Sequence, residues 1–186
     1  MRVVSGSAKG RKLQSVPGDT TRPILDRVKT ALFDILRPEL SDTKVLDLFG
    51  GSGSIGIEAL SQGAQHATFI ELAQSAVRVI EANLEMTGLR QYAAVRCDDA
   101  FRFLKNCKDS FDIVFVAPPQ YKGLWIQAMH MLAERPSVIA SGGLVVVQID
   151  PVENEELVLR DLSLENQRRY GSTLLLFFRK TEEHHG

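Results

Sequence analysis

Residues 45–60 read VLDLFGGSGSIGIEAL, and this stretch decides the fold class. The apolar run at 45–49 predicts a buried strand, and the glycine-rich run after it predicts a tight turn. Residues 55–62 follow with helical periodicity, and Gly63 lies where a helix C-terminal cap is expected. A strand joined through a glycine turn to a helix predicts a doubly wound α/β sheet, in which ligands bind at the carboxyl ends of the strands.

The alternation of strand and helix continues along the chain. Further strands are predicted at 67–70, 93–97, 111–116 and 144–149, and further helices at 73–87, 100–106 and 124–134. Residues 111–116 are almost wholly apolar, which is typical of a parallel strand buried on both faces. An antiparallel hairpin is expected at 163–170 and 173–179. Before the sheet, residues 1–14 predict two short strands, and 24–36 predict a helix that Pro38 ends.

The composition predicts one soluble globular domain. The chain has 186 residues, of which 44% are hydrophobic and 24% are charged. We expect an appendage of hairpin and helix at 1–40, a main domain at 41–180 and a polar tail at 181–186. The chain has neither an apolar run of membrane-spanning length nor a signal peptide at its start, so we expect a cytoplasmic protein without membrane contact. Cys97 and Cys107 lack histidine partners, which favours reduced thiols over a metal site.

Positive charge is concentrated at the start of the chain. The net charge is -1, yet residues 1–29 carry +5 and the remainder -6. The basic side chains of this segment are Arg2, Lys9, Arg11, Lys12, Arg22, Arg27 and Lys29. A basic segment on an acidic body predicts a local contact with a polyanion such as RNA. The alternative is a solvated basic face without a partner.

Acidic residues lie at the ends of three predicted strands. Asp47 interrupts the first strand, Glu71 ends the second, and Asp98 and Asp99 follow the third. A carboxylate in the cleft would repel a pyrophosphate but would suit a cationic amino group such as that of S-adenosylmethionine. Glu71 is placed to accept hydrogen bonds from both ribose hydroxyls, a feature shared with NAD sites, and Asp98 or Asp99 could hold the adenine amino group. The alternative is that these acids cap helices.

The glycine run narrows the cofactor class. Gly51, Gly53 and Gly56 satisfy G-x-G-x-x-G, which fits a dinucleotide, another nucleotide-like cofactor or tight packing. A P-loop is excluded because Ile57 and Glu58 follow the last glycine, and the G-x-S-x-G nucleophile motif fails as well. The predicted cofactor-binding residues are Asp47, Phe49, Gly50, Gly51, Ser52, Gly53, Glu71, Leu72, Asp98, Asp99 and Ala100.

The strand at 111–116 leads into Ala117-Pro118-Pro119-Gln120-Tyr121. Two adjacent prolines fix the backbone and leave carbonyl groups free of the sheet ladder. A nearby aromatic ring can stack on a planar substrate such as a base. A plain break between strand and loop is the alternative.

The chain resembles the bacterial ribosomal small-subunit methyltransferase D family from residue 1 to about 180. The resemblance is carried by Arg2–Gly6 with Lys9–Leu13, Thr21–Pro23 with Asp26–Val28 and Ala31–Phe33, the stretch from Val45 to Leu60, and Tyr170-Gly171. It implies a seven-stranded Rossmann-like class I methyltransferase sheet and S-adenosylmethionine as cofactor. It also implies methyl transfer to the exocyclic N2 amine of a guanine in 16S rRNA, as free rRNA or in a small-subunit assembly intermediate. By the same resemblance, rRNA phosphates would be gripped by Arg2, Lys9, Arg11, Lys12, Arg22 and Arg27.

The sequence departs from that family at its catalytic turn, which reads Asp or Asn, Pro, Pro, aromatic. Ala117 holds the first position here, Gln120 the fourth, and Tyr121 comes one place later; Gln148 stands where the family's Glu is expected. Residues 117–121 remain the predicted catalytic residues, with Tyr121 stacked on the base. The carbonyls of Ala117 and Pro118, with Gln120 or Gln148, would replace the missing acid. Two alternatives stay open: a homologue that binds cofactor and RNA without catalysis, and an NAD(P)-dependent oxidoreductase.

Overall fold

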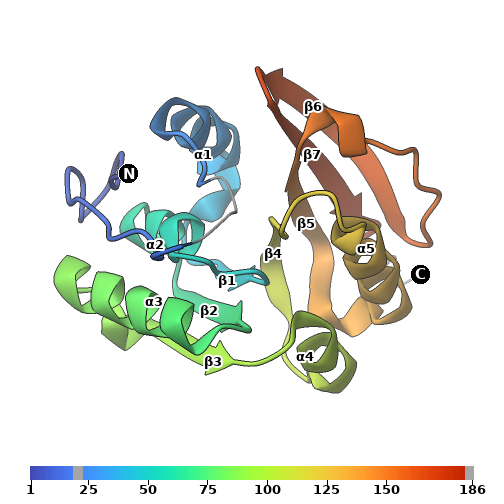
Figure 1. Cartoon of the computed structure of the whole chain (residues 1–186). Coiled ribbons are helices and arrows are strands. Elements are labelled where there is room, and N and C mark those ends of the chain that lie inside the picture. The colour runs from blue at the N-terminus through green and yellow to red at the C-terminus, as the bar shows by residue number, and fades with distance from the viewer. Residues whose placement is uncertain (19–22, 183–186) are drawn as a thin grey trace.

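The computed structural model describes residues 1–18 and 23–182, and these form one seven-stranded sheet covered by helices (Figure 1). The strand order is β3-β2-β1-β4-β5-β7-β6. The first five of these strands run parallel, whereas β7 is antiparallel to both β5 and β6. The strands are β1 (Lys44–Asp47), β2 (His66–Glu71), β3 (Ala93–Cys97), β4 (Phe111–Val116), β5 (Ile139–Ile149), β6 (Leu162–Tyr170) and β7 (Thr173–Lys180). This sheet confirms the predicted doubly wound, Rossmann-like α/β class.

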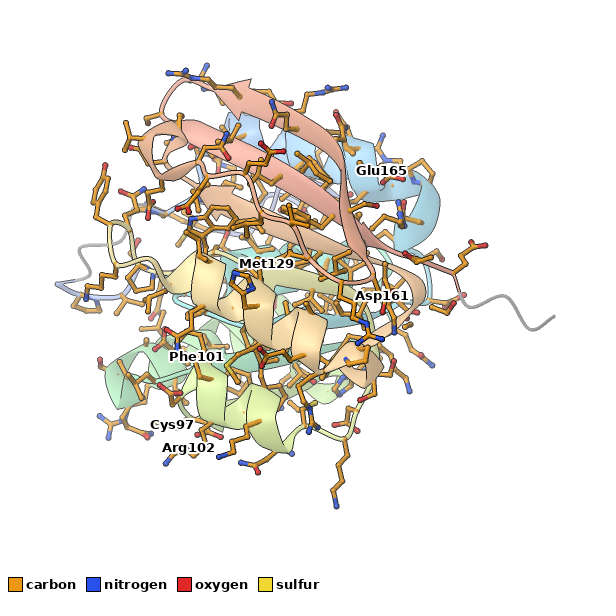
Figure 2. The ribbon with its side chains drawn as sticks, turned by 90° about the vertical axis from the view of Figure 1, so that its right-hand side faces the viewer. Cys97, Phe101, Arg102, Met129, Asp161 and Glu165 are labelled. Carbon is orange, nitrogen blue, oxygen red and sulfur yellow. The ribbon has the colours of Figure 1, made fainter. Side chains whose placement is uncertain are left out.

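Helices cover both faces of the sheet. They are α1 (Asp26–Leu40), α2 (Ser54–Ser61), α3 (Gln74–Thr87), α4 (Ala100–Asn106) and α5 (Leu124–Glu134), with 3-10 turns η1 (Arg90–Tyr92), η2 (Pro136–Val138) and η3 (Pro151–Glu153). The buried side chains of α1, α2 and α3 form one hydrophobic cluster, and those of α4 and α5 form a second. Figure 2 views the second face, with Phe101 on α4 and Met129 on α5. The two clusters follow from strand geometry, because successive side chains point to opposite faces.

The order of the strands places a switch point between β1 and β4. From β1 the chain adds β2 and β3 on one side, and then crosses to add β4 and β5 on the other. At such a point the two connecting loops leave in opposite directions, and the carboxyl ends of the strands open a crevice. Asp47 of β1 is the register partner of Phe115 of β4, so the glycine turn and the Ala117-Pro118-Pro119 turn emerge side by side.

The first 14 residues form a shorter antiparallel hairpin than expected, in which Val3 donates its N–H to the carbonyl of Arg11 and Leu13 donates to that of Met1. A single antiparallel bridge joins Arg2 to Lys12, and the residues between them form bends and turns. Distant groups also hold this backbone: Ser7 donates its N–H to the carbonyl of Ser61, and Val4 donates to the carboxylate of Glu58. The side chains of Val3, Ala8 and Leu13 belong to the cluster on the α1 face. The predicted domain boundary at residue 40 stays a prediction.

Two further boundaries differ from expectation. Helix α1 runs through Pro38 to Leu40, because burial of Leu40 at 1% exposure stabilises a last turn that lacks one backbone N–H. Strand β5 begins at Ile139, earlier than the expected residue 144, and its pairing with β4 shifts register between Phe111 and Ile113. Residues 19–22, including the predicted RNA contact Arg22, and residues 183–186 of the polar tail lie outside the described part. Within the described part, no helix is long and apolar enough to cross a membrane.

Candidate functional site

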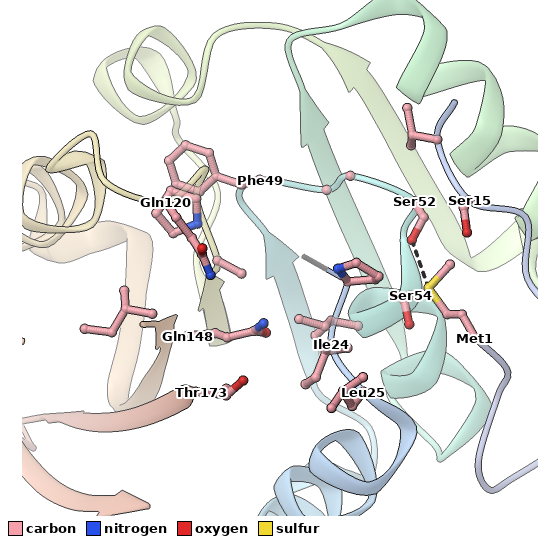
Figure 3. Close-up of a pocket in the computed structure, with 18 of the residues that line it drawn as sticks. Met1, Ser15, Ile24, Leu25, Phe49, Ser52, Ser54, Gln120, Gln148 and Thr173 are labelled. Carbon is pink, nitrogen blue, oxygen red and sulfur yellow. Dashed lines mark hydrogen bonds between the residues drawn. The ribbon is translucent and has the colours of Figure 1, made fainter. Parts of the chain in front are cut away.

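A cavity of about 520 Å³ opens at the switch point (Figure 3). Its volume falls within the range of roughly 300–1,000 Å³ that small-molecule sites occupy. Its walls come from the turn after β1, the ends of β4 and β5, the start of β7 and two parts of the N-terminal region. The lining residues on the sheet side are Phe49, Gly50, Gly51, Ser52, Ser54, Ile55, Ala117, Pro118, Gln120, Gln148, Ile149, Ser172 and Thr173.

The glycine turn brings backbone to the surface of this cavity. A Cβ atom on Gly50 would lie 2.9 Å from Cδ1 of Ile80, so a larger residue there would require the end of this α3 side chain to shift. Gly51 has a φ of +57° and faces open space, whereas Gly53 has a φ of +83° and begins α2 as its N-cap. The turn therefore offers a bare backbone cradle and the first N–H groups of a helix to a ligand.

Asp47 lies beneath this turn and does not line the cavity. Its side chain shares a sheet face with its register partner Phe115, on the α2 side, and its Oδ2 accepts a hydrogen bond of 3.2 Å from the N–H of Gly56. Asp47 is 1% exposed, and burial raises its pKa to about 8; the Gly56 bond opposes this shift, and the charge of Glu71 adds to it. The carboxyl group therefore carries its proton at neutral pH. Its contact with a cationic amino group stays a prediction. In this structure Asp47 stabilises the start of α2 through its hydrogen bond with Gly56.

Glu71 and Leu72 follow β2 at the edge of the glycine turn. The carboxylate of Glu71 accepts hydrogen bonds from the N–H of Gly51 (3.2 Å) and the N–H of Ala73 (2.8 Å), one on each oxygen. A carboxylate has about four acceptor positions, so two remain for a pair of hydroxyl groups. Leu72 is 66% exposed and presents an apolar side chain to solvent. This donor and acceptor set fits a ribose with an apolar contact for a planar ring beside it.

The two aspartates after β3 have different roles. Oδ1 of Asp99 accepts from the N–H groups of Phe101 and Arg102, so Asp99 caps α4, as the capping alternative predicts. Asp98 accepts from Arg102 Nε at 2.7 Å through Oδ1. Ala100 is buried in the cluster of the α4 face. Of the two acids, Asp98 is the one that could take part in ligand binding.

The turn after β4 contributes only part of its residues to the cavity. Ala117, Pro118 and Gln120 line it, whereas Pro119 and Tyr121 do not. Tyr121 has a φ of +64° and is 63% exposed. Its N–H donates to Glu153 and its hydroxyl donates to Asp150 Oδ2, each at 2.9 Å. These bonds join the turn after β4 to the segment after β5, and the predicted stacking of Tyr121 on a base stays a prediction.

Gln148 supplies a polar group that the cavity leaves unsatisfied. It lies in β5 one residue before the strand ends, and its side chain enters the cavity opposite Ile24 (Figure 3). Its Oε1 is buried and has no hydrogen-bond partner among the described residues. A buried acceptor without a partner costs about 1–3 kcal/mol, so this position suits a ligand that donates a hydrogen bond. Sequence reasoning singled out Gln148 as a departure from a family pattern and, with Gln120, as a candidate to replace the missing acid.

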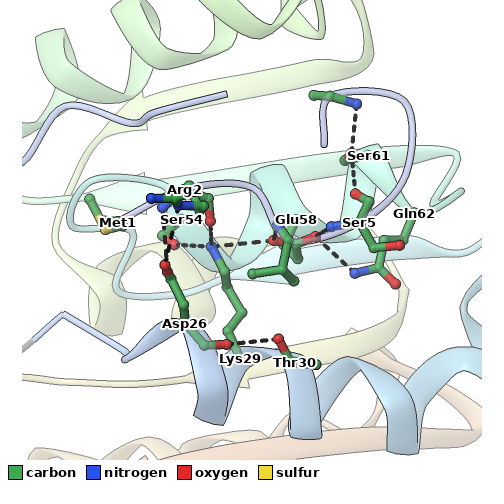
Figure 4. Close-up of polar contacts among 12 residues, drawn as sticks. Met1, Arg2, Ser5, Asp26, Lys29, Thr30, Ser54, Glu58, Ser61 and Gln62 are labelled. Carbon is green, nitrogen blue, oxygen red and sulfur yellow. Dashed lines mark hydrogen bonds and ion pairs between the residues drawn. The ribbon is translucent and has the colours of Figure 1, made fainter. Parts of the chain in front are cut away.

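A buried ion pair fixes the N-terminal wall of the cavity, which includes Met1 (Figure 4). Lys29 Nζ lies 3.2 Å from Glu58 Oε1, and both side chains are fully buried. Lys29 also donates to the carbonyl of Arg2 (2.6 Å) and to Ser54 Oγ (3.0 Å). Burial lowers the pKa of Lys29, and the charge of Glu58 opposes that shift. The pair thereby ties α1, α2 and the start of the chain together beside the glycine turn.

The predicted RNA-binding side chains lie outside the cavity. Arg2, Lys9, Arg11, Lys12 and Arg27 are all exposed, and none of them lines it. Arg2 pairs with Asp26 at 3.7 Å. Sequence reasoning missed the lining residues Met1, Ser15, Val16, Pro23, Ile24, Leu25, Ser172 and Thr173, because it considered the N-terminal region for its charge and the hairpin for its pairing.

Comparisons with known proteins give one family. A family model described as "Conserved hypothetical protein 95" matches residues 1–179. The chain is 36% identical over 184 residues to "Putative rRNA methyltransferase YlbH" of Bacillus subtilis, with 97% of this chain and 99% of that protein covered. It is 31% identical over 180 residues to "Ribosomal RNA small subunit methyltransferase D" of Escherichia coli K12, with 97% and 90% covered.

Solved structures agree with this result. The structure described as "Putative methyltransferase yhhF from Escherichia coli" has a TM-score of 0.86 at 33% identity, with 98% of this chain and 99% of that chain covered. An RNA methyltransferase from Salinibacter ruber, in complex with S-adenosyl-L-homocysteine, has a TM-score of 0.66 at 16% identity, with 88% and 96% covered, and shows the shared fold alone. The chain therefore belongs to the Conserved hypothetical protein 95 family, and with it to the family of ribosomal RNA small subunit methyltransferase D.

Proposed function

We propose that this protein transfers a methyl group from S-adenosylmethionine to the exocyclic N2 amine of a guanine in 16S rRNA. The observation that carries the proposal is the cavity at the switch point, where the glycine turn and the Ala117-Pro118 turn face the same space. The names of the relatives, an rRNA and a ribosomal small-subunit methyltransferase, support the substrate class. We expect the reaction to take place in the cytoplasm, on free rRNA or on a small-subunit assembly intermediate.

The described residues fit the cofactor. The open space at Gly51 accepts a ligand where a Cβ atom would intrude, and the two remaining acceptor positions of Glu71 suit the ribose hydroxyls. Leu72 would contact the adenine ring, and Asp98 would hold its amino group. When bound, S-adenosylmethionine supplies an electrophilic methyl group on a sulfonium.

The task of the protein toward the substrate is to orient a weak nucleophile. The lone pair of a guanine amine is delocalised into the ring, and acceptors for its two hydrogens localise that pair on nitrogen. Ala117 has no side-chain acceptor, so we assign this role to Oε1 of Gln148 together with the backbone carbonyls of Ala117 and Pro118. Positioning and hydrogen bonding of this kind supply most of the rate in such a site.

The described residues that line the cavity offer no side-chain base for the proton released by the amine. Among the described lining residues, every side chain is apolar, a hydroxyl, a thioether or an amide, and none is acidic or basic. As the new N–C bond forms and the S–C bond breaks, the amine loses one proton, and water in the open cavity takes it up. Catalysis by this chain then rests on orientation rather than on general base chemistry.

Methyl-labelled cofactor and unmodified 30S particles test the proposal. The parent protein should label a guanine N2 in 16S rRNA. Gln148→Leu keeps the side-chain size and removes the acceptor, so kcat should fall by about 10²–10³-fold with unchanged affinity for S-adenosylhomocysteine. Gln120→Leu is the matched comparison, since Gln120 lines the same cavity and is the other amide predicted to replace the missing acid. A larger fall in kcat with Gln120→Leu than with Gln148→Leu would move the acceptor role to Gln120. Absence of label with the parent, beside an active methyltransferase as positive control, would refute the proposal.

The side chain at position 117 favours one alternative, a homologue that binds cofactor and RNA without catalysis. Ala117 lines the cavity where the family pattern has an acid or amide. If this alternative is correct, the parent is inactive and Ala117→Asp creates activity. Calorimetry with S-adenosylhomocysteine and with NAD separates both methyltransferase hypotheses from the oxidoreductase hypothesis.

A further inference from the structure

The turn between β6 and β7 lies at the ligand edge of the sheet. Strand β7 is antiparallel to β5, and Leu174 pairs with Ile149 at the carboxyl end of β5. The start of β7 and the end of β6 therefore meet the edge at which β1 and β4 end. Ser172 and Thr173 line the cavity, so the hairpin forms one of its rims, and Figure 3 shows Thr173 there.

Three arginines surround this turn. Arg168 and Arg169 are exposed residues near the end of β6, and Arg27 is exposed in the first turn of α1. Arg168 lies on the α1 face of the sheet, opposite Leu175, and Arg169 lies on the α5 face, opposite Leu174, so the cations approach the turn from both faces. Nη2 of Arg27 lies 3.7 Å from the position that a Cβ atom on Gly171 would take, so α1 brings its guanidinium to the hairpin. Arg169 Nε donates to the carbonyl of Gly171 at 3.2 Å, which holds this side chain at the turn.

These guanidinium groups have no acidic partner among the described residues. Arg168 Nη1 donates to Asn166 Oδ1 and to the carbonyl of Gln167, both neutral groups. By contrast, Arg179 at the far end of the same hairpin is paired with Glu39 and Glu165. The positive charge is thus neutralised at the end of β7 that lies away from the cavity and left uncompensated at the end that borders it.

We propose that Arg168 and Arg169, with Arg27, form a second phosphate-binding rim that holds the RNA substrate across the cavity. The inference rests on the proposed function. It adds Arg168 and Arg169 to the predicted RNA contacts, all of which lie within residues 1–29. Met1, Ser15 and Val16 border the cavity from the N-terminal side, whereas Ser172 and Thr173 border it from the hairpin. An RNA strand that places a base in the cavity is then held by cations on the N-terminal side and on the hairpin side. Guanidinium groups suit this role because they match phosphate oxygens with two hydrogen bonds.

The test compares two variants that lose the same charge. Arg168→Gln/Arg169→Gln removes the rim. Lys105→Gln/Arg160→Gln removes two exposed cations distant from the cavity, one near the end of α4 and one before β6. Affinity for a 16S rRNA transcript and for unmodified 30S particles is measured between 50 and 200 mM salt. Calorimetry with S-adenosylhomocysteine and thermal melting report on the cofactor site and the fold.

Loss of two phosphate contacts should weaken RNA binding about tenfold near 0.15 M salt and lower the slope of log K against log salt by about 1.4. The control pair should keep the affinity and slope of the parent, and all variants should bind S-adenosylhomocysteine equally. Arg168→Lys/Arg169→Lys should recover most of the affinity. If the parent binds RNA and the rim variant binds as tightly, or if the control pair loses as much, the rim is refuted and the proposed function stands. If the parent binds neither the 16S rRNA transcript nor the 30S particles, the proposed function fails together with the rim.

Discussion

Replacement of Asp47 by asparagine should change how the stability of this protein depends on pH. Asp47 is 1% exposed, and burial raises its pKa to about 8, whereas an unfolded chain has a value of about 3.9. The folded protein therefore keeps a proton that the unfolded chain releases as the pH rises above about 4. Stability falls through this window and becomes constant above the folded pKa.

The magnitude follows from the size of the shift. Each pKa unit corresponds to about 1.4 kcal/mol, so the parent should lose about 4 kcal/mol of unfolding free energy between pH 5 and pH 8 through this group. An asparagine side chain at this position would not titrate and would keep an acceptor for the N–H of Gly56. Its buried amide donors cost about 1–3 kcal/mol at every pH. We expect Asp47→Asn to match the parent near pH 5 and to exceed it by about 2–4 kcal/mol at pH 8.

Urea unfolding of both proteins at pH 5, 6, 7 and 8 measures this difference. Other groups titrate alike in the two proteins, so their effects cancel in the difference. A difference that stays constant over this range would show that Asp47 is already ionised in the folded protein, and the argument from its burial would be wrong. S-Adenosylhomocysteine affinity at pH 7 adds a second result: a loss of more than a few-fold in Asp47→Asn would indicate that the carboxylate contacts the ligand.

Three further predictions concern the walls of the cavity. Lys29→Met leaves Glu58 buried without its cation and should lower the free energy of unfolding in urea by about 3–5 kcal/mol. Lys29→Met/Glu58→Gln should recover part of this free energy. A double variant no more stable than the single one would contradict the prediction. Gly51→Ala and Gly88→Ala both place a Cβ atom in open space at positive φ, so each should lower the free energy of unfolding by about 1–2 kcal/mol. Only Gly51→Ala should weaken S-adenosylhomocysteine binding in calorimetry. Equal affinities of the two variants would show that Gly51 does not face the ligand. Tyr121→Phe removes the hydrogen bond to Asp150 and should lower the free energy of unfolding by about 1 kcal/mol. If the ring stacks on the base, Tyr121→Phe should retain kcat and Tyr121→Ala should lose it. Equal losses of kcat in the two variants would assign the role to the hydroxyl.

The elements of the sheet could be predicted because their signals are local. The apolar run of β4 and the helix of α4 have the same bounds in the structure as in the prediction, since periodicity and flanking turns determine both. The segment at residues 1–14 shows the opposite case. Its glycines and small residues predict a hairpin, which forms around the Arg2–Lys12 bridge, but the N–H groups of Val4 and Ala8 bond to Glu58 and Ser61, more than 50 residues away. A single sequence does not contain the positions of such distant partners.

The site was predicted less completely than the fold, for a related reason. Strand ends indicate which residues approach the cavity, and Ala117, Pro118 and Gly51 do line it. The direction in which a side chain points depends on register, and Asp47 shares the face of Phe115 rather than opening into the cleft. Thr173 lies at the cavity because β7 is antiparallel and starts where β5 ends, which requires the pairing of the two strands to be known.

The charge that an RNA would meet at the surface of this protein differs from the charge counted along its sequence. Residues 1–29 carry +5 in the sequence, but Lys29 is fully buried against Glu58, so part of that charge is compensated within the fold by an acid outside the segment. Conversely, Arg168 and Arg169 belong to the acidic remainder of the chain and nevertheless stand without an acidic partner, among the described residues, at the rim of the cavity next to Arg27. A polyanion responds to the potential at the surface it approaches rather than to the charge of a sequence segment. Deletion of residues 1–12 should therefore lower RNA affinity without abolishing it, and the salt dependence that remains should be lost when Arg168 and Arg169 are also replaced by Gln.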